Sequence, residues 1–322
     1  MSKSNLKNIV NKILKFVIPT KTRKFLRQNR LLQTIHCNII KRQTIKLIPN
    51  LKSLDVNNSQ YIVSLTSYGR RLTSTAPYAI VSLLNQRLKP DKVILWVGIE
   101  EKNKLPKIME KLISKGLEIN FCEDIRSYTK LIPSLEKYPD NYIITADDDV
   151  YYPEKWFEEL ITEHRKSPNK IICHRAHGIK VDEDFNPLPY VQWDWRIDPN
   201  IYFMEGIFPT GVNGILYPPK CFHKDITNRE LFMNLSPYAD DIWFWAMAVI
   251  NKDFFGDESP YIVVKNSTSR KLLGIDPEQK KWGNALWNYN SQGGNDKQLT
   301  AIIEKYPQIR DVLKKIQPCI NQ

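Results

Sequence analysis

The stretch YIITADDDVYYP (Tyr142–Pro153) places three consecutive carboxylates, Asp147, Asp148 and Asp149, directly behind an apolar, strand-like run. Neighbouring aspartates repel one another, and aspartate is a poor strand former. The acidic run therefore needs either open solvent or a positively charged partner. Its place in the fold follows from the segments that precede it.

Residues 60–149 alternate between strand-like and helix-like segments. Each strand-like segment is nearly uniformly apolar, which is typical of a parallel sheet with helices on both faces. We therefore predict an α/β fold with a mostly parallel sheet. Strands are expected at 61–68, 91–98, 117–123, 141–149, 170–177 and 260–266, and helices at 75–86, 105–116, 131–140, 154–168 and 236–253.

Two polar clusters follow strands of this predicted sheet. The motif TSYGRR (residues 66–71) comes after the first strand, and the acidic run comes after the fourth. Ligands of such sheets bind at the carboxyl ends of the strands. The sequence therefore predicts a ligand site that contains both clusters.

The net charge of +12 is confined to one end of the chain. Residues 1–50 hold twelve of the 47 basic residues and no acidic residue, so the remaining 35 basic residues balance 35 acidic ones. A nucleic-acid-binding domain carries basic residues across its binding surface, and not on a terminal arm alone, so no nucleic-acid partner is expected. We place a basic helical arm at residues 1–55 and an α/β domain at residues 56–322.

The arm contains amphipathic patterns. In residues 5–17 the apolar side chains recur on one helix face, and a second basic stretch spans residues 21–43. Basic amphipathic helices lie on anionic membrane surfaces, although such an arm can also pack on its own domain. Five cysteines without a CxxC pair fit a reducing compartment, and no apolar run reaches 18 residues. We expect a cytoplasmic protein, peripheral to the inner face of the cell membrane.

The order of these motifs resembles the GT-A-fold glycosyltransferases, a Rossmann-type family that transfers sugars from nucleotide-diphosphate donors. The resemblance rests on TSYGRR after the first strand, ADDD (146–149) after the fourth, and a later ADD (239–241) that opens a helix. It covers roughly residues 60–300 and is nearest to bacterial enzymes that build capsule or lipopolysaccharide glycans.

The resemblance implies a divalent cation at the acidic run. A hard cation such as Mn²⁺ or Mg²⁺ neutralises the donor diphosphate, and carboxylate oxygens are suitable ligands for it. Asp149 is then the expected metal ligand, Asp147 a ribose or metal contact, and the extra Asp148 leaves the register open by one. The alternative is an Asp-rich turn that caps the following helix.

The resemblance also assigns nucleotide-sugar contacts. Hydroxyls, a ring and two guanidinium groups in the loop after the first strand suit a ribose, a base and phosphates. A polar loop with solvated arginines is the alternative. The expected contacts are Thr66, Ser67, Tyr68, Arg70, Arg71, Asp147 and Asp148, with Lys130 as a donor-binding lysine.

Asp240 and Asp241 are the candidates for the general base of an inverting reaction. The family places such a carboxylate at a helix start downstream of the metal motif, where it removes the proton of the acceptor hydroxyl. Acidic residues in a first helical turn are also stabilised by the helix dipole without any catalytic role.

Weaker candidates lie elsewhere in the chain. Asn295, Asp296 and Lys297 could contact the diphosphate or the metal, where many family members carry a histidine. His174 and His177 are expected to be structural. Trp193 and Trp195, at alternate positions, either stack on acceptor sugars or pack in the core.

We therefore expect a metal-dependent, inverting glycosyltransferase of the hexosyl or N-acetylhexosaminyl class, acting in capsule or lipopolysaccharide biosynthesis. Its partners would be a nucleotide-diphosphate sugar, a glycan or lipid-linked acceptor and a membrane surface. A sugar-phosphate nucleotidyltransferase is the nearest alternative, but those enzymes open with a richer glycine loop than SYGRR. A non-catalytic glycan- or nucleic-acid-binding protein is the third possibility.

Overall fold

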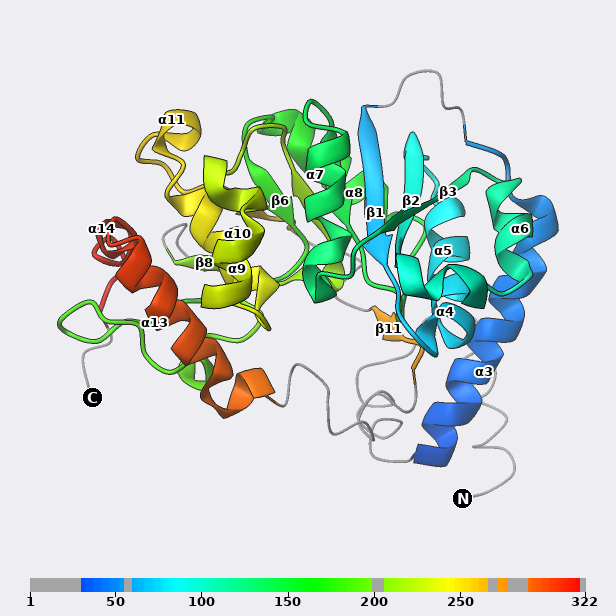
Figure 1. Cartoon of the computed structure of the whole chain (residues 1–322), viewed down its shortest axis with the longest axis horizontal. Helices are drawn as coiled ribbons and strands as arrows, with labels where there is room; N and C mark the ends of the chain where they lie inside the picture. The colour runs from blue at the N-terminus through cyan, green and yellow to red at the C-terminus, as the bar shows by residue number, and fades with distance from the viewer. Residues whose placement is uncertain (1–29, 55–59, 199–205, 266–271, 277–288, 319–322) are drawn as a thin grey trace.

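The computed structural model describes residues 30–54, 60–198, 206–265, 272–276 and 289–318. A seven-stranded mixed sheet runs through this part of the chain, in the order β10-β6-β9-β4-β1-β2-β3 (Figure 1). Its strands are β1 (Tyr61–Thr66), β2 (Lys92–Gly98), β3 (Leu117–Cys122), β4 (Tyr142–Thr145), β6 (Ile171–Cys173), β9 (Ile215–Tyr217) and β10 (Tyr261–Val263).

Most neighbouring strands of this sheet are parallel. β1 pairs in parallel with β2 and β4, β2 with β3, and β10 with β6. Only β9 runs against its neighbours, lying antiparallel to both β4 and β6. The predicted α/β class with a mostly parallel sheet is confirmed.

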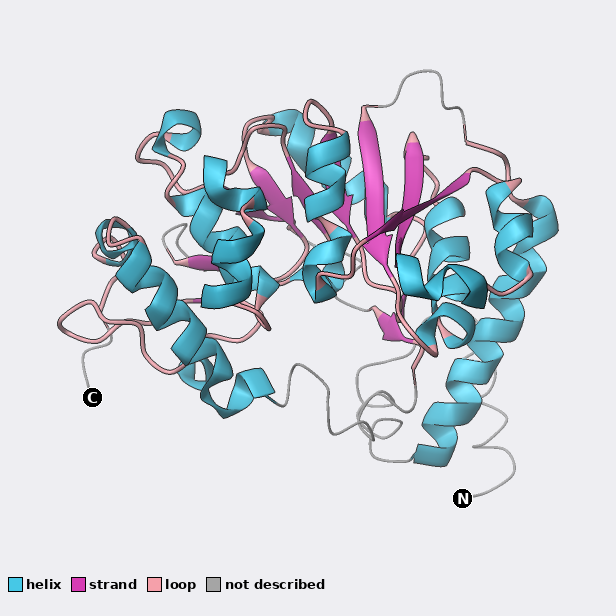
Figure 2. Cartoon of the chain, in the orientation of Figure 1, coloured by secondary structure: helices cyan, strands magenta, loops and turns pink. Residues whose placement is uncertain are grey.

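Helices cover both faces of the sheet (Figure 2). Adjacent strand residues enter two separate cores, as Ile62 lies in one and Val63 in the other. Both faces are buried, which explains why the strands lack an apolar–polar alternation. One core receives α5 (Ala76–Leu84), α6 (Ile108–Ile113) and α8 (Trp156–Lys166), and the other receives α7 (Ile132–Lys137), α9 (Arg229–Leu235), α10 (Asp240–Val249), α13 (Asn295–Lys305) and α14 (Ile309–Leu313).

Several elements are shorter than predicted. The strand expected at 141–149 ends at Thr145, because the carboxylates leave the sheet. The strand expected at 170–177 divides into β6 and β7 (Ala176–Gly178), and β7 pairs with β8 (Ile207–Pro209) in a separate ribbon. The remaining short elements are α4 (Arg71–Ser74), α11 (Lys252–Phe255), and the pair β5 (Val150–Tyr151) and β11 (Leu273–Gly274).

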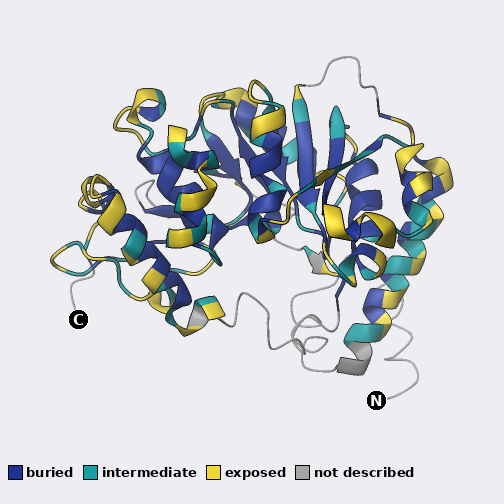
Figure 3. Ribbon diagram, in the orientation of Figure 1, coloured by how far each residue is buried: buried dark blue, intermediate teal, exposed yellow. Residues whose placement is uncertain are grey.

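The described part of the second basic stretch, residues 30–43, lies in the helix α3 (Arg30–Leu47), which lies beside α5 (Figure 1). Its side chains Cys37, Ile40 and Thr44 are buried (Figure 3), so this part of the predicted arm packs on the domain. The amphipathic pattern at residues 5–17 lies outside the described residues. Among the described residues, no helix is long and apolar enough to cross a membrane.

Candidate functional site

The two polar clusters meet because β1 and β4 are parallel neighbours. Ser64 lies opposite Thr145 in the register of this pair, and the Ala146 amide donates to the Ser64 carbonyl at 2.9 Å. The loop after β1 and the acidic run after β4 therefore leave the same edge of the sheet side by side. This is the edge where the sequence predicted the ligand site.

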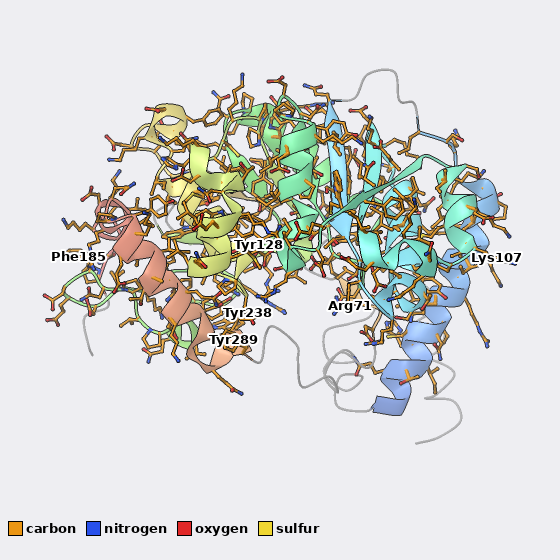
Figure 4. The ribbon with its side chains drawn as sticks, in the orientation of Figure 1. Arg71, Lys107, Tyr128, Phe185, Tyr238 and Tyr289 are labelled. Atoms are coloured by element: carbon orange, nitrogen blue, oxygen red, sulfur yellow. The ribbon has the colours of Figure 1, made fainter. Side chains whose placement is uncertain are left out.

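Arg71 is the positive partner that the acidic run requires. Its Nη1 lies 2.9 Å from Asp148 Oδ1, and its Nη2 lies 3.0 Å from Asp149 Oδ2. Ser67 Oγ donates to the other Asp148 oxygen at 2.6 Å. Burial raises the pKa of Asp149 to about 7 despite the opposing charge of Arg71. Figure 4 shows Arg71 below the strands, at the start of α4.

Lys130 joins the acidic run to the later acidic pair. Its Nζ lies 3.0 Å from Asp240 Oδ2 and 3.6 Å from Asp147 Oδ1. The backbone carbonyl of Lys130 accepts from Ser64 Oγ at 2.6 Å, which ties the residue to β1. Burial alone would lower the pKa of Lys130, but Asp240 and Asp147 raise it well above its usual value. Lys130 is therefore a fixed cation between the two acidic clusters.

Asp241 is held by the backbone rather than by a cation. The Gly211 amide lies 3.2 Å from each Asp241 carboxylate oxygen. A Cβ at residue 211 would lie 2.9 Å from Lys130 Nζ and 3.1 Å from Asp241 Oδ1, so glycine permits this close approach. Burial raises the pKa of Asp241 to about 7, and neighbouring Asp240 adds to the rise. A carboxylate with this pKa is suited to general base catalysis near neutral pH.

Five carboxylates lie in the site. Within the described residues, Arg71 and Lys130 form ion pairs with four of them, and Asp241 accepts from the Gly211 amide. Carboxylate oxygens are suitable ligands for a divalent cation, and Mg²⁺ sites typically use one or two carboxylates together with phosphate oxygens. No described group of three or more His, Cys, Asp or Glu side chains could hold a metal by itself. A cation bound at the end of β4 would therefore need further ligands, such as the oxygens of a diphosphate.

The other predicted loop residues have separate partners. Thr66 Oγ1 donates to the Trp96 carbonyl at 3.0 Å, within the sheet. Arg70 Nη2 lies 2.6 Å from Oδ2 of Asp276, which is buried. Tyr68 has an exposed fraction of 64%, so its ring is accessible to a ligand. The Asp276 contact was not predicted, because 206 residues separate it from Arg70.

The weaker candidates divide into structural and exposed groups. His174 Nε2 lies 3.0 Å from the Trp156 carbonyl, and Asp296 accepts from the Tyr190 amide at 2.7 Å. Trp193 is buried and its indole donates to the Leu188 carbonyl. These contacts are structural.

Among the remaining candidates, Asn295 is buried and Lys297 is exposed, both in the first turn of α13. Trp195 has an exposed fraction of 42%.

No protein-family profile and no curated protein sequence matches the chain. Solved structures show distant similarity. A mannosyltransferase from Pyrobaculum calidifontis in complex with GDP-Man and Mn²⁺ is 10% identical, with a TM-score of 0.46 over 90% of this chain and 80% of its own.

Two further solved structures are similar at a comparable level. S. aureus TarS in complex with UDP is 9% identical, with a TM-score of 0.41 over 65% of this chain and 58% of its own. A 4-diphosphocytidyl-2C-methyl-D-erythritol synthase from Anaerococcus prevotii is 17% identical, with a TM-score of 0.41 over 72% of this chain and 97% of its own.

Proposed function

We propose that the protein is a divalent-cation-dependent glycosyltransferase that uses a nucleotide-diphosphate sugar. One observation supports this function above the others. Lys130 Nζ lies within ion-pair distance of both Asp147, in the acidic run at the end of β4, and Asp240, in the acidic pair at the start of α10. A transfer reaction needs both parts, because the leaving diphosphate must be neutralised while the acceptor hydroxyl is deprotonated.

Each part of the site has a role in this reaction. Asp147 and Asp149 would hold Mn²⁺ or Mg²⁺, which supplies electrostatic stabilisation of the leaving diphosphate. Arg71 fixes the orientation of Asp148 and Asp149 through its two ion pairs. The exposed ring of Tyr68 would contact the nucleoside, since the hydroxyls of Thr66 and Ser67 already donate to the Trp96 carbonyl and to Asp148.

Asp241 would accept the proton of the acceptor hydroxyl. Its pKa of about 7 lets it exist as the carboxylate near neutral pH and still bind a proton strongly. Asp240 would remain the partner of Lys130 at 3.0 Å. A carboxylate base that acts directly on the acceptor supports an inverting displacement.

The acceptor would be a glycan or a lipid-linked glycan of a bacterial surface polymer. The eight basic residues within residues 1–29 support this choice, because they would bring the enzyme to an anionic membrane surface. A hexosyl or N-acetylhexosaminyl donor is proposed on the resemblance to capsule and lipopolysaccharide enzymes.

The test is release of nucleoside diphosphate from a panel of UDP- and GDP-sugars, with and without Mn²⁺. We expect release that depends on Mn²⁺, and a loss of roughly 100-fold or more in Asp147→Ala and Asp149→Ala, since one such electrostatic contact contributes about 3 kcal/mol. Asp140→Ala is the matched control, because the Asp140 side chain is 80% exposed.

Two results would contradict the proposal. Wild-type release by both site variants would exclude the acidic run as the cation site. Pyrophosphate release from a nucleoside triphosphate and a sugar phosphate would instead identify a nucleotidyltransferase. Melting temperatures of all variants distinguish a lost contact from a lost fold.

A further inference from the structure

A second group of polar side chains lies next to Asp241, on the ribbon formed by β7 and β8. The Thr210 amide, just after β8, donates to the Arg175 carbonyl at 3.1 Å. The next amide in the chain, that of Gly211, contacts Asp241. The start of β7 is therefore joined to the proposed base through two consecutive backbone amides.

Arg175 is a largely buried cation without a carboxylate partner among the described residues. Its Nε is buried and has no hydrogen-bond partner there. Burial and, to a smaller extent, the nearby charge of Arg196 lower the pKa of Arg175 to about 10, although the more distant charges of Asp241 and Asp147 oppose the shift. A buried guanidinium that lacks an anion is costly, so the arrangement suits an anion that comes from a ligand.

His177 presents a second donor at the same place. Its Nδ1 accepts the Arg196 amide at 3.0 Å, so the neutral ring carries its hydrogen on Nε2. Nε2 lies 3.5 Å from Arg175 Nη2, and both atoms are donors. They cannot hydrogen-bond to each other, but one anionic oxygen could accept from both. Arg196, whose amide makes this contact, has a φ of +58°, a conformation that is uncommon outside glycine.

Aromatic rings adjoin these donors. The Trp195 ring lies 4.5 Å from the His177 ring and 5.6 Å from the Tyr190 ring, measured between centroids. Trp195 is 42% exposed, although its neighbour Trp193 is buried in the core. A partly exposed aromatic ring beside the guanidinium of Arg175 and the buried imidazole of His177 is suited to a sugar ring that carries an acidic group.

We propose that Arg175 and His177 form the anion-binding end of an acceptor subsite, with Trp195 stacking on the sugar ring. The ligand would be an acceptor sugar that carries a carboxylate or a phosphate. The assignment to the acceptor rests on the proposed function, because the acceptor hydroxyl must reach Asp241. The predicted donor contacts lie instead on the loop after β1.

The test measures binding to the full chain by saturation-transfer NMR, with three probes. They are methyl β-glucuronide, glucose 6-phosphate and the neutral methyl β-glucoside. We expect one or both anionic probes to bind at least about tenfold more tightly than the neutral one, because charge-assisted hydrogen bonds are about twice as strong as neutral ones. Comparison of the two anionic probes identifies carboxylate or phosphate as the preferred group.

Variants assign the preference to particular residues. Arg175→Gln should bring the affinity ratio close to one, Arg175→Lys should keep part of the preference, and Trp195→Ala should weaken all three probes alike. Arg87→Gln is the matched control, since Arg87 is an exposed arginine paired with Glu158. Should Arg175→Gln fail to fold, the other two site variants still test the assignment.

Three results would overturn the proposal. The first is equal affinity of the wild type for all three probes. The second is an unchanged preference in a folded Arg175→Gln protein. The third is competition of UDP or GDP with the anionic probe, which would place this site in the donor pocket. These titrations need no donor and no metal. The subsite proposal can therefore be supported even if no glycosyltransferase activity is found, and it can be refuted even if that activity is found.

Discussion

Replacement of the two adjacent aspartates by asparagine should change stability in opposite directions. Asp240 is an ion-pair partner of Lys130 at 3.0 Å, but Asp241 accepts only neutral backbone donors in its described contacts. Asparagine keeps the size of aspartate and removes its charge. Asp240→Asn therefore removes a favourable charge, and Asp241→Asn removes an unfavourable one.

The pKa of Asp241 sets the size of the effect. Its folded value is raised from 3.8 to about 7, so its contribution to stability is fully present below about pH 3.8 and is lost as the pH rises through about 7. At pH 8 the ionised carboxylate costs up to about 4 kcal/mol, and its replacement by asparagine loses about 1 kcal/mol of hydrogen bonding to Gly211. Asp241→Asn should thus be more stable than the wild type by up to about 3 kcal/mol.

Asp240→Asn should be less stable than the wild type. Loss of one partner from a buried ion pair costs about 3–5 kcal/mol. Lys130 keeps Asp147 at 3.6 Å, which places the expected loss at the lower end of that range.

The assay is urea unfolding at pH 5.5 and pH 8, without metal, together with turnover. The stability difference between Asp241→Asn and the wild type should grow by about 2 kcal/mol from pH 5.5 to pH 8, because the wild type alone loses its proton over that interval. Turnover of Asp241→Asn should fall about 10²- to 10⁴-fold, and wild-type kcat/KM should rise with pH through about 7.

Two outcomes would refute this reasoning. If Asp241→Asn is destabilised as much as Asp240→Asn, the folded protein does not disfavour the ionised form of Asp241. If Asp241→Asn keeps wild-type turnover, it is not the base.

Two further predictions concern the N-terminal arm and the packing beneath the site. Removal of residues 1–29 should leave the fold intact and weaken binding to anionic vesicles, because each of eight basic residues adds roughly 1 kcal/mol near such a surface; equal vesicle binding with and without these residues would exclude the membrane role. Gly214→Ala should destabilise the protein by about 2 kcal/mol or more in urea unfolding, since its φ is +96° and a Cβ would lie 2.4 Å from Trp156 Cζ2. Gly274→Ala, which would meet nothing within 4 Å, is its control, and equal stability of the two variants would contradict the packing argument.

Local patterns were sufficient to predict the α/β class and the convergence of the two polar clusters at one edge of the sheet. The apolar runs that became β1 and β4 are buried on both faces, so their composition alone indicates central parallel strands. The convergence of the loop after β1 with the acidic run follows from that topology. The β9 strand was not predicted, because its three residues are too few to show a hydrophobic period. It runs antiparallel to both of its neighbours, β4 and β6.

The chemistry of the site depends on pairs that are distant in the sequence. The sequence indicates that the acidic run needs a positive charge, because three adjacent carboxylates repel one another. Only the folded structure decides that Arg71 forms the ion pairs with Asp148 and Asp149, and that Lys130 forms the ion pair with Asp240. Charge and hydrophobic period are properties of a segment, and are visible in it. The partner of a charge, and the burial that shifts a pKa, are set by which segments the sheet brings together.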